Sequence, residues 1–309
     1  CRAHQRANAD PRAGTIPMKT SASKRGSLST SPSAGKVLAG PTPIEKLSKK
    51  VCRNLRGIFS DIDDTLTHHG KITEDAFTAM GKLRRAGLRM IPITGRPAGW
   101  VDHLARMWPV DAVIGENGAF YFFLDPKHGR DGKLVQRFVQ PRKEREANRK
   151  KLWEVFTQLQ KKMPGLQVAS DQGYREIDLA VDFCEDVDRL SSAEIDRIVA
   201  AFESAGAQSK ISSIHVNSWF GSHDKYSCCR LLLQELYAES FDKEKENYLY
   251  FGDSPNDEPL FREFPYTVGV SNVKEFLSRM RHHPSHITKK AGGHGFAEAV
   301  RWILKQRGE

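Results

Sequence analysis

Cysteines are few in this sequence of 309 residues, and they show no pairing pattern. The five are Cys1, Cys52, Cys184, Cys228 and Cys229. An odd number without a CxxC pair indicates neither a disulfide framework nor a zinc site. Reduced thiols in a cytoplasmic enzyme are therefore expected, and the adjacent pair in CCRLLLQEL is expected in a buried helix. A run of about 18 apolar residues is also lacking, so no membrane-spanning helix is predicted.

Excess positive charge is missing from most of the chain, although the formal net charge is +10. Residues 1–60 contain 12 Lys+Arg and 2 Asp+Glu, which leaves 36 basic and 36 acidic residues in the remainder. A protein that binds nucleic acid through a basic surface carries this charge on its folded part. The neutral remainder therefore predicts no specific nucleic-acid partner.

Large apolar residues are nearly absent from about the first 50 positions, which are rich in Ser, Ala, Gly, Pro and Lys. This composition cannot offset the entropic cost of ordering, so residues 1–52 are predicted to form a disordered basic tail. The tail also lacks the apolar segment of a secretory signal. The chain opens with Cys1 instead of Met, which suggests a fragment or a misassigned start, with Met18 as a plausible true start.

From about residue 55, short apolar segments alternate with helical ones. GIFS, LRMIPIT and VDAVIG have the composition of buried strands, and Thr73 and Gly87 are suited to cap and end a helix between the first two. Alternation of strands and helices predicts a parallel sheet with right-handed crossovers. The same rhythm resumes with a helix from Lys225 and the strand NYLYF. We therefore predict an α/β core formed by residues 53–125 and 214–309.

The intervening residues 126–213 are predicted to form an α+β insertion. A charged helix near residues 143–162 precedes YREIDLAVDF, which alternates apolar and polar residues as a strand with one solvated or ligand-facing side does. Glu176, Asp178 and Asp182 share the polar side, for which exposure to solvent is favoured over contact with a substrate. A sheet interrupted in this way suggests a catalytic core that carries a cap.

Three carboxylates within four positions follow the first strand, in GIFSDIDDTLTHHG. Asp61, Asp63 and Asp64 would repel one another unless a proton or a cation intervenes, which indicates a metal site or an acid/base pair. Ligands of parallel α/β sheets bind at the carboxyl ends of the strands. Three further polar motifs are expected at this edge: Thr94-Gly95-Arg96, Lys225 and the GDSPND segment at 252–257.

These four motifs, in this order, resemble the signatures of the haloacid dehalogenase (HAD) phosphohydrolase superfamily. The large insertion after the second motif is similar to the C2-type cap of subfamily IIB, the group of Cof-type and sucrose-phosphate phosphatase-like enzymes. The resemblance covers about residues 57–302. It implies a Rossmann-like core with a parallel sheet, an inserted cap that determines substrate specificity, and phosphatase activity that depends on Mg²⁺.

The resemblance also implies a role for each motif residue. Asp61 would be the nucleophile that forms an aspartyl-phosphate, and Asp63 the general acid and base. Thr94 and the Gly95 amide would hold the phosphoryl oxygens, and Lys225 would neutralise the charge of the phosphate and of Asp61. No chemical role is expected for Asp64. The implied metal ligands are Asp61, Asp63 through its backbone carbonyl, Asp253 and Asp257, and Asn256 and Asp257 would also orient Lys225 and metal-bound water.

Several other residues lie outside the four signatures or have a second interpretation. Arg96 either contacts the phosphate or forms a structural ion pair. His215 and Asn217, on a strand expected to re-enter the core, are candidates for substrate contact. The loop at 116–118, Glu-Asn-Gly, either lines the site or is a plain turn. The histidine pairs at 68–69 and 282–283 lack a set of partner ligands and are predicted to lie at the surface.

The predicted function is hydrolysis of a small phosphorylated metabolite, with a sugar phosphate favoured by the resemblance of the cap. One alternative is a phosphosugar mutase-type phosphoryl transferase, although the second motif of those relatives differs from Thr-Gly-Arg. Another alternative is a metabolite-binding domain that the basic tail tethers to nucleic acid or to an anionic membrane. The sequence leaves the metabolite and the oligomeric state open.

Overall fold

The computed structural model describes residues 40–212 and 214–309. Its main sheet has nine strands in the order β1-β15-β14-β13-β2-β5-β6-β7-β8. The neighbours from β1 to β6 pair in parallel, and β7 and β8 extend the edge in antiparallel pairing. The strands are β1 Thr42–Pro43, β15 His286–Ile287, β14 Tyr266–Gly269, β13 Tyr248–Gly252, β2 Gly57–Asp61, β5 Arg89–Ile93, β6 Val113–Gly115, β7 Phe120–Asp125 and β8 Lys133–Phe138.

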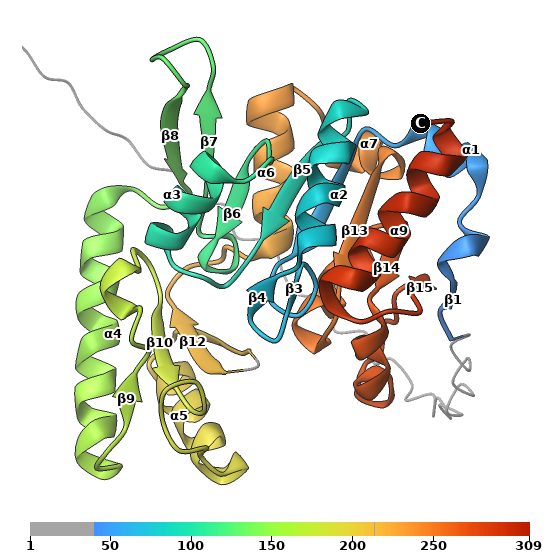
Figure 1. The fold of residues 1–309 in the computed structure, drawn as a ribbon. Helices are drawn as coiled ribbons and strands as arrows, with labels where there is room; N and C mark the ends of the chain where they lie inside the picture. The colour runs from blue at the N-terminus through green and yellow to red at the C-terminus, as the bar shows by residue number, and fades with distance from the viewer. Residues whose placement is uncertain (1–39, 213) are drawn as a thin grey trace, which may run out of the picture. The chain divides into compact units, whose positions relative to one another are not determined.

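Helices cover both faces of this sheet, as Figure 1 shows for α2 and α9 on one face and α6 on the other. Adjacent side chains of a strand point to opposite faces, so Ile58 packs with α1, α2, α3 and α9, whereas Phe59 packs with α6, α7 and α8. The helices are α1 Lys49–Asn54, α2 Glu74–Arg85, α3 Ala98–Met107, α6 Lys225–Tyr237, α7 Phe241–Glu244, α8 Glu258–Glu263 and α9 Gly292–Arg307. Burial on both faces explains the nearly continuous apolar sequences of the central strands.

A second sheet lies between β8 and α6 in the chain, within residues 139–224, here called the inserted segment. Its four strands have the order β11-β12-β10-β9 and pair antiparallel throughout. The helices α4 and α5 pack on it through a separate apolar cluster that includes Leu152, Phe156, Ile198 and Phe202. The elements are α4 Arg142–Lys162, β9 Gln167–Val168, β10 Leu179–Asp182, α5 Ser192–Ser204, β11 Gln208–Ile211 and β12 His215–Trp219. A small hairpin of β3 Thr67–His68 and β4 Lys71–Ile72 follows β2.

The fold confirms the predicted α/β class. The boundaries between core and insertion, expected at 125/126 and 213/214, do not coincide with the limits of the two sheets. Strand β8 pairs with β7 along its whole length and so extends the main sheet beyond residue 125. Strand β12 lies between β10 and β11. The expectation that His215 and Asn217 lie on a strand of the core was therefore wrong. The cause is that the sequence of a single strand does not reveal which sheet it joins.

The expectation of disorder to residue 52 was also wrong for its last part, while residues 1–39 lie outside the described residues. Strand β1 joins the sheet edge, and Ser48 caps helix α1 by accepting a hydrogen bond from the Val51 amide. Ile44, Leu47 and Cys52 are buried in the apolar cluster that includes α9. Their burial against another helix supplies the stabilisation that composition alone did not indicate.

Within the described part of the chain, no helix is both long and apolar enough to cross a membrane. The expected burial of Cys228 and Cys229 in helix α6 is confirmed.

Candidate active site

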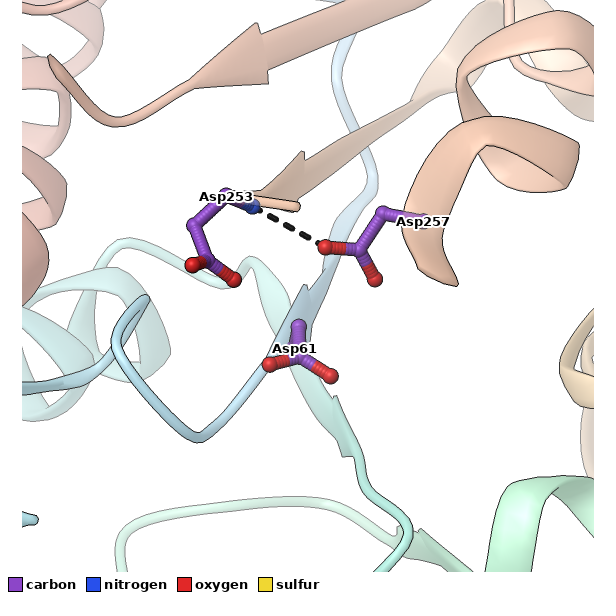
Figure 2. A group of neighbouring side chains, drawn as sticks. All are labelled: Asp61, Asp253 and Asp257. Carbon is purple, nitrogen blue, oxygen red and sulfur yellow. Dashed lines mark hydrogen bonds between the residues drawn. The ribbon is translucent and has the colours of Figure 1, made fainter. Parts of the chain in front are cut away.

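The carboxyl ends of β2 and β13 bring the first and fourth motifs together. These strands are parallel neighbours, with Ser60 opposite Phe251, so Asp61 and Asp253 follow at the same edge of the sheet. Figure 2 shows the side chains of Asp61, Asp253 and Asp257 around a common space. One carboxylate oxygen from each lies within 4.8 Å of the others, and all three residues are buried.

Lys225 is the cation that contacts this cluster. It is the first residue of α6, where Asp224 caps the helix by accepting a hydrogen bond from the Ser227 amide. Its Nζ lies 2.6 Å from Asp61 Oδ1 and 3.1 Å from Asp257 Oδ1. The lysine is buried, although a lysine at the start of a helix is commonly exposed to solvent.

Asp257 has both carboxylate oxygens occupied by hydrogen-bond donors. Oδ1 accepts from Lys225 and, at 2.5 Å, from the Tyr250 hydroxyl. Oδ2 accepts from the backbone amides of Asp253 and Ser254 at 2.9 and 3.3 Å. A carboxylate offers about four lone-pair directions, so this geometry is suited to positioning Lys225 and Asp253.

Asp253 and Asp61 accept fewer hydrogen bonds than Asp257, so more of their oxygen lone pairs can bind a metal ion. Asp253 Oδ1 accepts one bond from Thr65 Oγ1 at 3.3 Å, and Oδ2 accepts one from Asn272 Nδ2 at 3.0 Å. Asn272, on the short helix at Ser271–Glu275, also donates to the Asp64 carbonyl. The sequence contained no signal for Asn272, because it is a lone polar residue far from the motifs.

The electrostatics of the cluster fit a bound divalent cation. Burial, opposed by Lys225, raises the pKa of Asp61 to about 8. Burial and the neighbouring carboxylates of Asp257 and Asp61 raise the pKa of Asp253 well above its usual range. Three buried carboxylates against one ammonium group leave excess negative charge, and carboxylate oxygens are the ligands that Mg²⁺ prefers. Asp61 and Asp253 are therefore the residues best placed to hold such an ion.

The second motif lies after β5, adjacent to β2 in the sheet. Thr94 is fully buried, and its Oγ1 accepts a hydrogen bond from the Arg96 amide at 2.9 Å. The Arg96 side chain donates from Nε and Nη2 to Asp63, at 3.1–3.3 Å. Its Nη1 donates to Glu185 of the inserted segment at 3.2 Å. Arg96 therefore forms an ion pair with the predicted acid/base, one of the two interpretations of this residue.

His215 and Asn217 are buried side chains of β12 in the inserted segment. His215 Nε2 lies 2.9 Å from Glu185 Oε2, and Asn217 Nδ2 donates to Asp178 Oδ2 at 3.0 Å. Burial and the nearby Arg175 lower the pKa of His215. Both residues line the same cavity as Asp61, although they lie on the second sheet.

The solvated face expected for the inserted strand was wrong for Asp178 and Asp182, which are buried. Asp178 pairs with Arg175 at 3.0 Å, and the Asp182 carboxylate accepts bonds from the backbone amides of residues 184–186. Internal partners replace water for both carboxylates, which alternation alone could not reveal. Glu176 is more exposed and pairs with Arg145 at 3.0 Å.

The loop at 116–118 is more than a plain turn, because Glu116 is buried and Asn117 lines the cavity. Glu116 and Asn117 have φ values of 40° and 56°, unusual for residues other than glycine. At Gly118, with φ of 101°, an added Cβ would lie 2.1 Å from the Asp224 carbonyl oxygen, so only glycine allows this approach to the start of α6.

The cavity at these motifs has a volume of about 1030 Å³ and is lined by both the core and the inserted segment. Core residues at its wall include Asp61, Asp63, Gly95, Lys225, Asp253 and Asn256, and those of the inserted segment include Arg175, Arg189, Lys210, His215 and Asn217. His68 and His69, expected at the surface, also line it. A cavity of this size exceeds the volume of a phosphate group and has room for a metabolite attached to it.

A family model described as haloacid dehalogenase-like hydrolase matches residues 58–136 of the chain. The matched segment contains Asp61, Asp63, Thr94 and Arg96. The chain is 23% identical over 257 residues to a curated phosphoglycolate phosphatase of Methanobrevibacter smithii, an alignment that covers 80% of this chain and 97% of the relative.

Solved structures share the fold of this chain at low sequence identity. A protein of Thermoplasma acidophilum has a TM-score of 0.61 and 20% identity, with 81% of this chain and 98% of the other covered. The sucrose-phosphatase of Synechocystis, solved with sucrose and phosphate, has a TM-score of 0.56 and 18% identity over 81% and 98% of the two chains. The predicted family, fold class and enzyme class, a phosphoric monoester hydrolase, are confirmed by these matches.

Proposed function

We propose that the protein is a Mg²⁺-dependent phosphatase that hydrolyses a small phosphorylated metabolite through an aspartyl-phosphate on Asp61. The observation that carries this proposal is the contact of Lys225 with Asp61 inside a cluster of buried carboxylates. A phosphate monoester is an anion, so positive charge must be present before a carboxylate can attack it. Lys225 supplies part of this charge.

Asp61 and Asp253 would hold the metal ion, together with the Asp63 backbone carbonyl, and Asp257 would position the site through its hydrogen bonds. When bound, Mg²⁺ supplies the positive charge that offsets the negative charge of the phosphoryl group and of Asp61. Thr94 Oγ and the Gly95 amide would bind phosphoryl oxygens, beside Asn256 on the cavity wall.

The reaction would have two displacements at phosphorus. An Asp61 oxygen attacks phosphorus while the bond to the metabolite oxygen breaks, and Asp63 gives its proton to that oxygen. Asp63 then takes a proton from water as the water oxygen attacks phosphorus, and the bond to Asp61 breaks to release inorganic phosphate. Arg96, which contacts Asp63, would hold this carboxylate at the cavity wall between the two steps.

The inserted segment would act as the cap that selects the metabolite, and His215 and Asn217 would contact it. A sugar phosphate is the favoured substrate class. It is supported by the polar side chains of the inserted segment at the cavity wall, such as Lys210 and Asn217, and by the likeness to a fold that in Synechocystis binds sucrose and phosphate. The curated relative is named for phosphoglycolate, so short phosphorylated acids belong in the same test.

The test is release of inorganic phosphate from a panel of sugar phosphates, disaccharide phosphates, phosphoglycolate, phosphoglycerates and nucleotides, with Mg²⁺ or with chelator. Strong Mg²⁺-dependent release from one sugar phosphate is expected. Release from phosphoglycolate alone would support the phosphatase activity and contradict a sugar phosphate as the substrate class. No release from any compound by folded protein, with phosphoryl transfer seen only after a bisphosphorylated sugar is added, would replace the phosphatase by the mutase reaction.

A further inference from the structure

Arg175 is a buried arginine of the inserted segment whose guanidinium reaches the core. Its side chain is 1% exposed. Nε donates to Asp171 Oδ1 at 3.1 Å, and Nη1 donates to both oxygens of Asp178 at 3.0 and 3.1 Å. The same Nη1 donates to the backbone carbonyl of Gly95 at 3.0 Å. The last of these bonds ties the inserted segment to the loop that follows β5.

The carbonyl that Arg175 contacts belongs to the peptide unit between Gly95 and Arg96. The N–H of that same unit, on Arg96, donates to Thr94 Oγ1 at 2.9 Å. Because a peptide unit is planar, a bond that fixes its carbonyl also fixes the direction of its N–H. A cation at the carbonyl oxygen polarises the unit and strengthens the bond from its N–H.

Thr94 Oγ1 accepts this bond, and this limits the acceptors to which its own O–H can donate. A hydroxyl has one O–H donor and can accept through its lone pairs. With a lone pair occupied by the Arg96 amide, the O–H is directed toward a different acceptor. In the site proposed above, that acceptor is a phosphoryl oxygen.

A second buried contact holds Arg175 in place. The Glu116 carboxylate accepts bonds from the amides of Glu176, Ile177 and Asp178 at 2.6–3.0 Å, directly after Arg175 in the chain. It also accepts at 3.0 Å from the amide of Ala98, just after the Thr94 loop. Four donors on two oxygens fix the distance between these two loops.

We propose that Arg175 is a positioning residue for phosphate binding: from the inserted segment, it orients the Gly95–Arg96 peptide and through it the Thr94 hydroxyl. The inference rests on the proposed function, because Thr94 is assigned there to the phosphoryl group. The phosphate site of the core is thus completed by a residue outside it. Lysine cannot replace Arg175, because one ammonium group cannot reach Asp171, Asp178 and Gly95 with the spacing of a planar guanidinium.

The experiment measures the affinity of the full-length, Mg²⁺-loaded protein for inorganic phosphate by calorimetry in four proteins: wild type, Arg175→Lys, Thr94→Val and the double variant. Loss of a hydrogen bond to a charged donor predicts that Arg175→Lys weakens binding by about tenfold. In the Thr94→Val background the same change is expected to weaken binding by less than about twofold, because its effect passes through Thr94. Equal effects in both backgrounds, or none in either, would overturn the proposal.

Asp171→Asn is the matched control, since it removes the charged partner of Arg175 Nε and leaves the bond from Nη1 to Gly95 in place. It is expected to lower the melting temperature while phosphate affinity stays within about twofold of wild type. An equal loss of affinity in this variant would make Arg175 a merely structural residue. If Arg175→Lys does not fold, the paired change Arg175→Gln with Asp178→Asn, which removes one charge of each sign, replaces it with the same expected results.

Thr94→Val alone separates this proposal from the one it rests on. Weaker phosphate binding in that variant supports the role of Thr94 in the proposed function. Affinity equal to wild type would contradict that role whatever Arg175→Lys does. Weaker binding in Thr94→Val with no change in Arg175→Lys would leave the phosphate site in place and overturn only the role of Arg175.

Discussion

The ammonium group of Lys225 lies 2.6 Å from the carboxylate of Asp61, although the two residues are 164 positions apart in the chain. Helix α6 presents Lys225 from one face of the sheet, and β2 presents Asp61 at its carboxyl end. Lys225 also contacts Asp257, so the buried pair links the first, third and fourth motifs of the site. Its removal should therefore affect stability and activity together.

Lys225→Met is expected to abolish activity and to lower the free energy of unfolding by about 3–5 kcal/mol, since it leaves buried carboxylates without their cation. Chemical denaturation in the presence of chelator measures this loss. Added Mg²⁺ is expected to restore part of the stability. Lys161→Met, at an exposed position of α4, is the control and should leave both quantities unchanged. Wild-type stability in the Lys225 variant would contradict the burial of an ion pair.

Mg²⁺ is expected to stabilise the protein even without substrate, because only the folded chain brings Asp61 and Asp253 together. At an ion concentration about 100 times the dissociation constant the gain would be about 2.7 kcal/mol. Thermal unfolding with increasing Mg²⁺ measures it. Asp253→Asn should remove the gain, whereas Asp64→Asn, at a backbone φ of 57° that asparagine tolerates, should keep it. A gain that persists in Asp253→Asn would place the ion elsewhere.

Tyr250→Phe removes the hydroxyl that donates to Asp257 at 2.5 Å. The expected cost is about 1.5–3 kcal/mol of stability, the range for a hydrogen bond to a charged group, and roughly tenfold in kcat because Asp257 positions Lys225. The matched control is Tyr248→Phe on the same strand, whose hydroxyl donates to Glu239 at 2.5 Å away from the motifs. It should lose stability and keep kcat. Equal kcat values in the two variants would contradict the positioning role proposed for Tyr250.

His223, in the chain segment between β12 and α6, gives the protein a pH-dependent stability. It is 3% exposed and stacks on Trp219, and burial lowers its pKa from 6.5 to about 4. In the unfolded chain it takes up a proton near pH 6.5, whereas the folded protein resists protonation until about pH 4. Stability is therefore full above pH 6.5 and falls between pH 6.5 and 4, by about 3 kcal/mol from this residue.

Unfolding by denaturant across this pH range tests the prediction in wild type and in His223→Phe, which keeps a ring against Trp219. The variant should lose about 3 kcal/mol less on acidification than wild type. Parallel curves for the two proteins would show that His223 does not titrate as its burial requires.

Three of the four motifs could be predicted from sequence because each is short and follows a strand of the main sheet whose apolar residues are easy to recognise. The remaining motif, Lys225, begins helix α6. Residues that reach the site from other elements could not be predicted. Asn272 carries no local signal, and Arg175 was concealed in a segment whose polar residues looked solvated. Tyr250 is the exception, because its position two residues before Gly252 on a strand that ends at the site could have indicated it.

The errors in the fold have a common physical origin. The segment around Ile44 and Leu47 is ordered by burial against α9, which lies near the other end of the chain. Strands β8 and β12 join their sheets by pairing with strands that the local sequence does not specify. Local composition predicts which residues form a strand or a helix. It does not predict which distant element will stabilise them.

The most direct test of the account is to detect phosphate on Asp61 during turnover. Wild-type protein and Asp61→Asn would be mixed with Mg²⁺ and the best substrate of the panel, quenched rapidly in acid, and analysed by mass spectrometry of the peptide that contains residue 61. The account predicts a phosphorylated Asp61 peptide in wild type, and in the variant a folded protein without the adduct whose turnover is at least ~10⁴-fold lower. Turnover by Asp61→Asn at the wild-type rate, with no phosphate on residue 61 in either protein, would contradict it.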